Sequence, residues 1–256
     1  MEKKIEISAV VIVKNEEKNI EDCLKSLDFV DEIIVVDTGS TDKTIAIASK
    51  YANKIVEQID GSFSSWRNAG MRESSGILVL HIDADERATK DVAKEIKSLI
   101  YDKTAAYAIP RRNIILGRVM KHGGWWPDYV IHLLRKDSFK FWKGDLHEEP
   151  VFEGVLKYLK SPLIHKKHDN LTDMVTKTNK WSEIEAKLMH DAHHPDMNIV
   201  RFTSAMVREF YLRMIKNMAF LDGPEGIIYA LYQVFSRFVS YAKLYEMQLS
   251  NKKEKV

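Results

Sequence analysis

Residues 77–85 read Ile-Leu-Val-Leu-His-Ile-Asp-Ala-Asp, an apolar run that ends in two carboxylates. The apolar part, residues 77–82, has the length and composition of a strand buried in a sheet. Asp83 and Asp85 stand one residue apart where this strand ends, and carboxylates so placed suit a hard divalent cation together with diphosphate oxygens. A polar turn before a helix near residues 89–99 is the alternative interpretation. The position at the end of an apolar strand favours a site.

Three further strands precede this one. Residues 7–13 (ISAVVIV) and 32–36 (EIIVV) are apolar on both faces, and residues 54–58 form a shorter strand. Helical patterns occupy the intervening segments, which are residues 19–27, 42–51 and 64–74. The alternation of strand and helix predicts a parallel, doubly wound sheet.

Polar residues follow the strands at the edge where such a sheet binds its ligand. Ligands of doubly wound sheets lie beyond the carboxyl ends of the strands. The first strand runs into Lys14, Asn15 and Glu16, and the second runs into Asp37. Arg67 on the third helix is placed to contact a pyrophosphate or a base, with a solvated helix face as the alternative. The sequence has neither a GxGxxG fingerprint nor a P-loop, so a dinucleotide fold is not indicated.

The middle of the chain, residues 105–165, is rich in Trp, Gly, His and Arg. Short strands with intervening loops are the expected structure, and this composition suits an acceptor site. A carboxylate there is placed to deprotonate an incoming hydroxyl, with a charged loop as the alternative. The candidates are Asp128, Asp145, Glu148 and Glu149. His165 follows a short apolar run and is a candidate to complete a metal shell.

From residue 171 onward the chain is expected to be helical. One apolar stripe recurs every four residues and consists of Phe202, Met206, Phe210, Met214 and Met218. A second stripe consists of Ile228, Leu231, Phe235, Phe238, Ala242, Tyr245 and Leu249. The stripes are expected either to pack on the catalytic domain or to lie in a lipid interface. Anionic headgroups would then suit Arg201, Arg208, Arg213 and Lys216.

Composition excludes several classes of protein. The 256 residues carry a formal charge of +2, which argues against a protein that binds nucleic acid through a basic surface. The single cysteine, Cys23, excludes an intrachain disulfide and is typical of a reducing compartment. No apolar run approaches the roughly 20 residues that span a bilayer. We expect a cytoplasmic protein, with peripheral contact at the inner face of the cytoplasmic membrane as a further hypothesis.

Four segments resemble one known family in their order and spacing. They are VVIVKNEE (10–17), VVDTGSTDKT (35–44), WRNAGMRESSG (66–76) and LHIDADE (80–86). The chain is similar to glycosyltransferase family 2, whose members are inverting enzymes with the GT-A fold and a DxD motif. Later segments resemble, more loosely, the branch of lipopolysaccharide core β-glucosyltransferases. They are HGGWWPD (122–128), LHEEP (146–150) and AFLDGPEGIIYAL (219–231).

The resemblance implies a role for each matching residue. The nucleotide pocket would be lined by Lys14, Asn15, Glu16, Asp37 and Arg67. Asp83 would contact the ribose or the metal, Asp85 would bind Mn²⁺ or Mg²⁺, and Glu148 would be the general base, with Asp145 as the second candidate. The chain departs from the branch at His132, which precedes Leu133, Leu134 and Arg135 where relatives usually carry an arginine. If that position contacts the acceptor, the acceptor differs.

The resemblance also implies an architecture and a reaction. Residues 1–168 would form the GT-A catalytic domain, divided into a nucleotide-sugar half (1–103) and an acceptor half (104–168), and residues 169–256 a helical extension. The reaction would be inverting transfer of a hexose from a UDP-sugar to a cell-envelope glycan or a lipid-linked saccharide. Transfer to a peptide side chain and a non-catalytic sugar-nucleotide-binding module are the alternatives. No nucleic-acid partner is expected.

Overall fold

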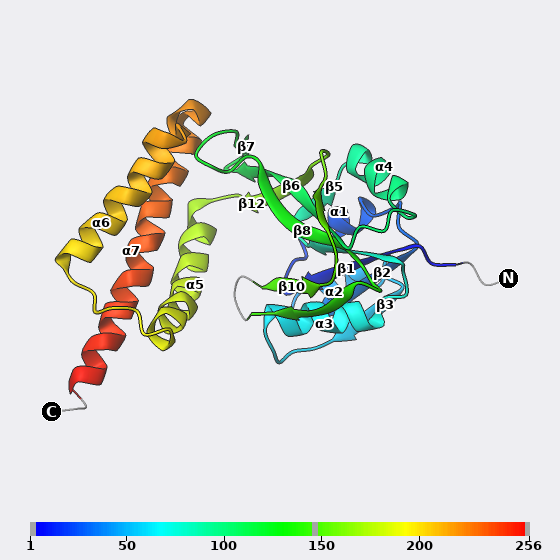
Figure 1. Ribbon diagram of the computed structural model, residues 1–256, viewed down its shortest axis with the longest axis horizontal. Coiled ribbons are helices and arrows are strands. Elements are labelled where there is room, and N and C mark those ends of the chain that lie inside the picture. Colours follow the sequence, from blue (N-terminus) through cyan, green and yellow to red (C-terminus); the bar gives the residue numbers. More distant parts are fainter. Residues whose placement is uncertain (1–3, 145–147, 254–256) are drawn as a thin grey trace. The chain divides into compact units, whose positions relative to one another are not determined.

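The computed structural model describes residues 4–144 and 148–253. Two compact units make up the chain, and both are drawn in Figure 1. Unit 1 comprises Met1–Arg112 and Asp128–Lys166, and unit 2 comprises Asn113–Pro127 and Lys167–Val256. Asp145 and His147, which flank the proposed base, lie outside the described residues.

A parallel arrangement of four strands forms the first half of the sheet, in the order β3-β2-β1-β4. Its strands are β1 (Ile7–Val13), β2 (Glu32–Asp37), β3 (Lys54–Glu57) and β4 (Leu78–Asp83). The residues of β1 are nearly all buried, as expected for a central parallel strand. These strands match the predicted segments to within one residue at each end.

The second half of the sheet is mixed and continues in the order β8-β6-β12-β5. Its strands are β5 (Glu86–Ala88), β6 (Ala106–Ile115), β7 (Arg118–Val119), β8 (Asp128–Arg135), β11 (Leu156–Tyr158) and β12 (Leu163–His168). β8 runs antiparallel to both β4 and β6, and β7 and β11 pair with β6. β9 (Phe139–Lys143) and β10 (Glu149–Phe152) form a separate antiparallel pair.

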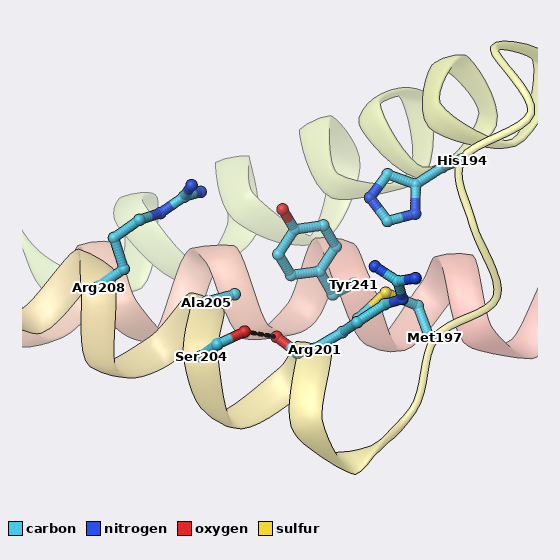
Figure 2. Close-up of a pocket in the computed structure, with 7 residues that line it drawn as sticks. All are labelled: His194, Met197, Arg201, Ser204, Ala205, Arg208 and Tyr241. Atoms are coloured by element: carbon cyan, nitrogen blue, oxygen red, sulfur yellow. Dashed lines mark hydrogen bonds between the residues drawn. The ribbon is translucent and has the colours of Figure 1, made fainter.

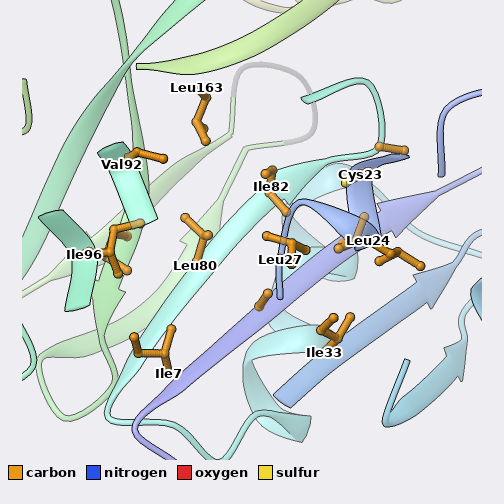
Figure 3. Packing of buried hydrophobic residues seen from close by; sticks show 14 of the residues in the cluster. Ile7, Cys23, Leu24, Leu27, Ile33, Leu80, Ile82, Val92, Ile96 and Leu163 are labelled. Atoms are coloured by element: carbon orange, nitrogen blue, oxygen red, sulfur yellow. The ribbon is translucent and has the colours of Figure 1, made fainter. Parts of the chain in front are cut away.

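Helices cover both faces of the parallel strands. They are α1 (Ile20–Lys25), α2 (Thr44–Ala48), α3 (Phe63–Glu73) and α4 (Lys90–Ser98). On one face Leu80 packs in a cluster with Leu24 of α1 and Ile96 of α4 (Figure 3). On the other face α3 approaches β1 so closely that a Cβ on Gly70 would lie 2.2 Å from Val10 Cγ1. The predicted doubly wound, mostly parallel sheet is therefore confirmed, and the absence of a side chain at Gly70 lets α3 lie close to β1.

Unit 2 is built on helices. They are α5 (Leu171–Asp191), α6 (Ile199–Phe210), a π-helical turn (Tyr211–Lys216), a 3₁₀ turn (Ala219–Asp222) and α7 (Gly223–Lys253). Both α5 and α6 pack against α7 (Figure 1). Among the described residues, none of the helices combines the length and the apolar character that crossing a membrane requires. The predicted helical C-terminal extension is confirmed.

The two predicted apolar stripes differ from what the structure contains. Lys216 ends the helical segment that follows α6, and Met218 adopts a left-handed backbone with φ of 51°, so the first stripe does not continue along one helix. In the second stripe every residue except Ala242 is exposed. The buried face of α7 carries Tyr229, Tyr232 and Leu244 instead. Helical periodicity therefore identified α7 and an apolar face that is largely exposed, of which Phe238 and Tyr245 contact Phe202 of α6.

Candidate active site

The carboxyl ends of three neighbouring strands define the site. β1 ends at Val13, which pairs with Asp37 at the end of β2. Ile12 of β1 pairs with Asp83 at the end of β4. The loops after these strands therefore start at one level of the sheet edge. The sequence predicted this convergence from the fold rule for doubly wound sheets.

Hydrogen bonds join the loops after β1 and β2. Asp37 Oδ1 accepts from Ser40 Oγ at 2.6 Å and from the Ser40 amide at 3.0 Å. The Asn15 amide donates to Ser40 Oγ at 3.1 Å, and Asn15 Oδ1 accepts from the Thr41 amide at 2.7 Å. Asn15 has a left-handed φ of 55°, a conformation that asparagine adopts more readily than most residues. These contacts fix the two loops as one rigid wall.

Two more of the predicted nucleotide-binding residues lie in the same wall. The Glu16 amide donates to Thr44 Oγ1 at 2.7 Å, and its Oε2 accepts from Asn19 at 2.8 Å. The Lys14 ammonium nitrogen lies 3.9 Å from the point that a Cβ on Gly39 would occupy. Lys14 thus places a positive charge over the turn that follows β2.

Arg67 connects the two halves of unit 1. Its Nε donates to Glu148 Oε1 at 2.7 Å, and its Nη2 donates to Asp83 Oδ1 at 3.0 Å. The guanidinium is buried and also lies over the ring of Trp142, 5.1 Å from its centroid. Burial lowers the pKa of Arg67, but the carboxylates of Asp83 and Glu148 outweigh this effect and the net shift is upward. Arg67 therefore stays charged and holds two carboxylates that are far apart in the sequence.

Asp85 and His165 form the second contact of the site. β5 pairs antiparallel with β12, and this pairing brings His165 opposite Glu86, the residue after Asp85. His165 Nε2 lies 3.5 Å from Asp85 Oδ2, and the Lys166 amide donates to the Asp85 carbonyl at 2.9 Å. In the described ranges, no three His, Cys, Asp or Glu side chains are grouped closely enough to hold a metal ion. Asp85 and His165 together offer two ligand atoms.

Behind these residues lies a buried charge cluster that the sequence did not reveal. Glu86 is 0% exposed, and its carboxylate lies 3.3 Å from His132 Nε2 and 3.6 Å from an Arg111 nitrogen. Burial raises the pKa of Glu86, but His132, His165 and Arg111 outweigh it and hold this pKa well below its ordinary value. Glu86 Oε2 also accepts from the Asp83 amide at 3.0 Å. The cluster thus fixes the backbone at the start of the DxD motif.

The same cluster affects Asp83. Burial raises the pKa of the Asp83 carboxyl, Arg67 opposes this, and the like charges of Glu86 and Asp85 add to the increase, so the net shift is upward. A positive charge nearby favours the ionised form of a carboxyl group. The surroundings of Asp83 therefore favour a cationic partner at this sheet edge.

His132 is buried among protein groups, whereas the sequence raised the hypothesis that this position contacts the acceptor. The ring is buried, its Nδ1 lies 2.7 Å from the His81 carbonyl oxygen, and its Nε2 faces Glu86. His132 therefore lies inside the protein with its Nε2 against the carboxylate of Glu86. Glu86, the residue directly after the DxD motif, was the only sequence signal for this cluster, and its partners Arg111 and His132 lie 25 and 46 positions further along the chain.

The remaining described acid candidates form no ion pair with Arg67. Asp128 forms an ion pair with Arg111 at 2.7 Å. Glu149 begins β10 and is exposed. Of the described acid candidates, Glu148 alone is joined to the DxD motif through a shared guanidinium.

Known proteins resemble this chain over most of its length. The sequence model of the family described as "Glycosyl transferase family 2" matches residues 8–158. An uncharacterised glycosyltransferase of Rickettsia felis is 28% identical over 262 residues, covering 96% of this chain and 92% of the relative. The lipopolysaccharide core biosynthesis glycosyltransferase LpsC of Rhizobium meliloti is 25% identical over 259 residues, covering 95% and 93%.

A solved structure shows a similar fold. The crystal structure of Staphylococcus aureus TarS 1-349 in complex with UDP-GlcNAc matches with a TM-score of 0.50 and 16% identity. The match covers 94% of this chain and 89% of that chain. The mixed, mostly parallel sheet with its helices matches the fold of this GT-A neighbour.

Proposed function

Because the chain belongs to glycosyltransferase family 2 and has its GT-A fold, it is a glycosyltransferase, and we propose that it is an inverting, metal-dependent hexosyltransferase. The observation that carries this proposal is the bridge from Asp83 through Arg67 to Glu148. The bridge joins the carboxylate that begins the DxD motif to Glu148, a candidate base in the other half of unit 1. In this proposal residues 1–103 bind the donor, residues 104–168 bind the acceptor, and residues 169–256 are a helical extension.

The proposed donor is a UDP-hexose. The nucleotide would lie against the wall formed by the loops after β1 and β2, where Lys14, Asn15, Glu16 and Asp37 meet. The ammonium group of Lys14 suits a diphosphate, and carboxylate and amide oxygens suit the base and ribose. The TarS structure with UDP-GlcNAc supports a uridine diphosphate donor.

The proposed cofactor is Mn²⁺ or Mg²⁺. Neighbouring ligands at roughly 2.1 Å from such an ion lie about 3 Å apart, which Asp85 Oδ2 and His165 Nε2, at 3.5 Å, approach. Mg²⁺ and Mn²⁺ sites commonly take few protein ligands and complete their shell with water and substrate phosphates, so this pair fits the ion. Asp83 is the third candidate, although its Oδ1 contacts Arg67. The ion would neutralise the charge of the departing diphosphate.

Glu148 would act as general base in a single displacement. The acceptor hydroxyl oxygen forms the new bond to the anomeric carbon, and the bond from that carbon to the diphosphate oxygen breaks with its electron pair leaving on the diphosphate. The hydroxyl proton passes to Glu148. Arg67 occupies Oε1, and no other side chain of the described segments donates a hydrogen bond to this carboxylate. Oε2 is thus the oxygen for the proton.

The proposed acceptor is a cell-envelope glycan or a lipid-linked saccharide. Similarity to LpsC over nearly the full length supports it. Such an acceptor would be reached by a cytoplasmic protein in peripheral contact with the inner face of the cytoplasmic membrane. A peptide side chain as acceptor is the second candidate, and a non-catalytic sugar-nucleotide-binding module is the third.

The test is Glu148→Gln, which preserves shape but cannot take the proton. We expect the turnover number to fall about a hundredfold or more while donor affinity stays near wild type. Glu149→Gln, one residue along and exposed, is the matched control. Normal turnover in Glu148→Gln together with a loss in Asp145→Asn would move the base to Asp145. A wild-type protein that binds UDP-sugars but neither transfers nor hydrolyses them with Mn²⁺ would support the non-catalytic alternative.

A further inference from the structure

Unit 2 contains a pocket of about 210 Å³ between α6, α7 and the loop that precedes α6. Its lining includes His194, Met197, Arg201, Ser204, Arg208 and Tyr241, which Figure 2 shows around one hollow. The pocket is lined by residues of unit 2 alone and is separate from the DxD motif of unit 1. None of the residues that line it in the described structure is acidic.

Basic and neutral hydrogen-bonding groups surround this pocket. Arg201 and Arg208 lie seven residues apart on α6, which places them on one face two turns apart. Ser204 lies between them and donates to the Arg201 carbonyl at 3.1 Å. The Tyr241 hydroxyl faces the same space from α7 (Figure 2). Guanidinium groups prefer anions with several oxygens, so the pocket fits a phosphate group.

Neither arginine forms an ion pair with an acidic side chain of the described residues. Arg201 Nε donates to the Asp196 carbonyl at 3.1 Å, and Arg208 forms no ion pair with a described residue. The only acidic residue between Ile199 and Lys216 is Glu209, which is buried and forms an ion pair with Arg213 at 2.9 Å. Arg213 is therefore not available to headgroups, which corrects the expectation for that residue. The exposed charge along α6 is entirely positive.

An exposed apolar edge runs beside the arginines. Val200 directly precedes Arg201, and Val207 directly precedes Arg208, so the apolar–arginine pair repeats after seven residues. Val200 is 71% exposed and Val207 is 60% exposed, and Tyr211 continues this edge. A soluble phosphate would use the arginines but would leave these side chains in water. A lipid surface uses both, because the headgroup region takes up apolar side chains beside basic ones.

We propose that α6 docks on an anionic phospholipid surface, with a lipid phosphate held in the pocket between Arg201 and Arg208. The inference rests on the peripheral membrane contact proposed above and names the surface that makes it. A second copy of the chain is the less suitable occupant, because two such surfaces would place like charges opposite each other.

The test is flotation of the full chain with phosphatidylcholine vesicles that contain phosphatidylglycerol. Wild-type protein should float with these vesicles and not with phosphatidylcholine alone. The double variant R201Q/R208Q should partition about thirtyfold more weakly, since each basic residue near the surface contributes about a factor of five. The matched control is K94Q/K97Q, which removes the same charge from exposed positions on α4 and should float like wild type.

Further arms separate the possible occupants. V200S/V207S should lose the part of the binding that survives high salt, which a purely electrostatic contact would not show. Equal flotation of R201Q/R208Q and wild type would overturn the proposal. It would also be overturned if inorganic phosphate raises Tm and vesicles do not bind, or if sedimentation shows a dimer that R201Q/R208Q disrupts. Hydrolysis of the sugar-nucleotide donor by R201Q/R208Q at the wild-type rate separates failure of the membrane surface from failure of the proposed enzyme.

Discussion

Units 1 and 2 distribute polar and apolar residues in opposite ways. In unit 1 the apolar residues are buried on both faces of a sheet, and charged residues collect at the carboxyl edge of its strands. In unit 2 the helices expose many apolar residues, while Thr178, Asp222 and Ser240 are buried. The proposed active site therefore lies where the sheet topology concentrates charge. The exposed apolar residues of unit 2 are the basis of the membrane-docking surface proposed above.

The largest effect should come from the charged edge of unit 1. Asp85→Asn removes the charge of the proposed metal ligand and should lower the initial rate of transfer about a thousandfold or more. The fold should persist, because the Asp85 side chain is partly exposed and Asn has nearly the same size and shape as Asp. The rate is measured with excess Mn²⁺ and the fold by thermal unfolding. Asp91→Asn on the solvent side of α4 is the control. Full activity in chelator would exclude the metal.

A matched pair of leucines tests the contrast in burial. Leu80 is 0% exposed in the sheet of unit 1, and Leu231 is 49% exposed on α7. Leu80→Ala should lower the free energy of unfolding by about 3 kcal/mol, because it removes buried methyl groups and leaves a cavity. Leu231→Ala should change it by less than about 0.5 kcal/mol. Urea unfolding followed by circular dichroism measures both. A similar loss in the two variants would mean that Leu231 is covered in solution.

The same contrast explains what the sequence predicted. The alternation of strands and helices predicted that Asp37, Asp83 and Asp85 lie at one edge of the sheet, without any knowledge of side-chain packing. This is possible because the carboxyl ends of parallel strands lie at the same edge. The helical periodicity of α7 indicated an apolar face, but it did not indicate which element packs against the helix. The packed face is held by hydroxyl contacts that involve Thr178 and Tyr232, which hydropathy scores as polar. Its position could not be derived from apolar spacing.

The buried charge cluster was missed for a related reason. A fully buried glutamate is unfavourable unless cationic partners surround it, and those partners must be known before the site can be predicted. His132 and Arg111 reach Glu86 from β8 and β6. Sequence alone shows three polar residues in three strands. The Arg67–Glu148 contact is similar, since 81 residues separate its members.

Removing a buried hydroxyl tests the polar interior of unit 2. The Tyr232 hydroxyl donates to the Met174 carbonyl at 2.5 Å and contacts the Thr178 hydroxyl. Tyr232→Phe leaves both partners without this hydrogen bond and should lower the free energy of unfolding by about 1–2 kcal/mol. Tyr245→Phe, at an exposed position on the same helix, should have almost no effect. Urea unfolding measures both variants. An equal loss in free energy of unfolding for Tyr232→Phe and Tyr245→Phe would mean that the buried and exposed faces of α7 do not differ in this respect.

The smallest effect should be a pH dependence at the rim of unit 1. Asp102 accepts from the Thr104 hydroxyl at 2.7 Å, from its amide at 2.9 Å and from Lys157 Nζ at 3.1 Å, and these donors lower the pKa of Asp102 from 3.8 to about 2. A carboxyl group with a lowered pKa stabilises the fold above its unfolded pKa, and the stabilisation is lost as pH falls through the folded value. The window therefore runs from about pH 4 down to about pH 2. Screening at this partly exposed site limits the contribution to about 1 kcal/mol.

The measurement is the free energy of unfolding in urea, from neutral pH down to this window. The difference in this free energy between wild type and Asp102→Asn should shrink as pH falls. Asp60 is an exposed carboxylate without these donors, so the difference between wild type and Asp60→Asn should stay near zero throughout. If the difference in free energy of unfolding between wild type and Asp102→Asn stays constant through the window, ionisation of Asp102 does not stabilise the fold. The contacts of Asp102 with Thr104 and Lys157 would then stabilise this site irrespective of charge.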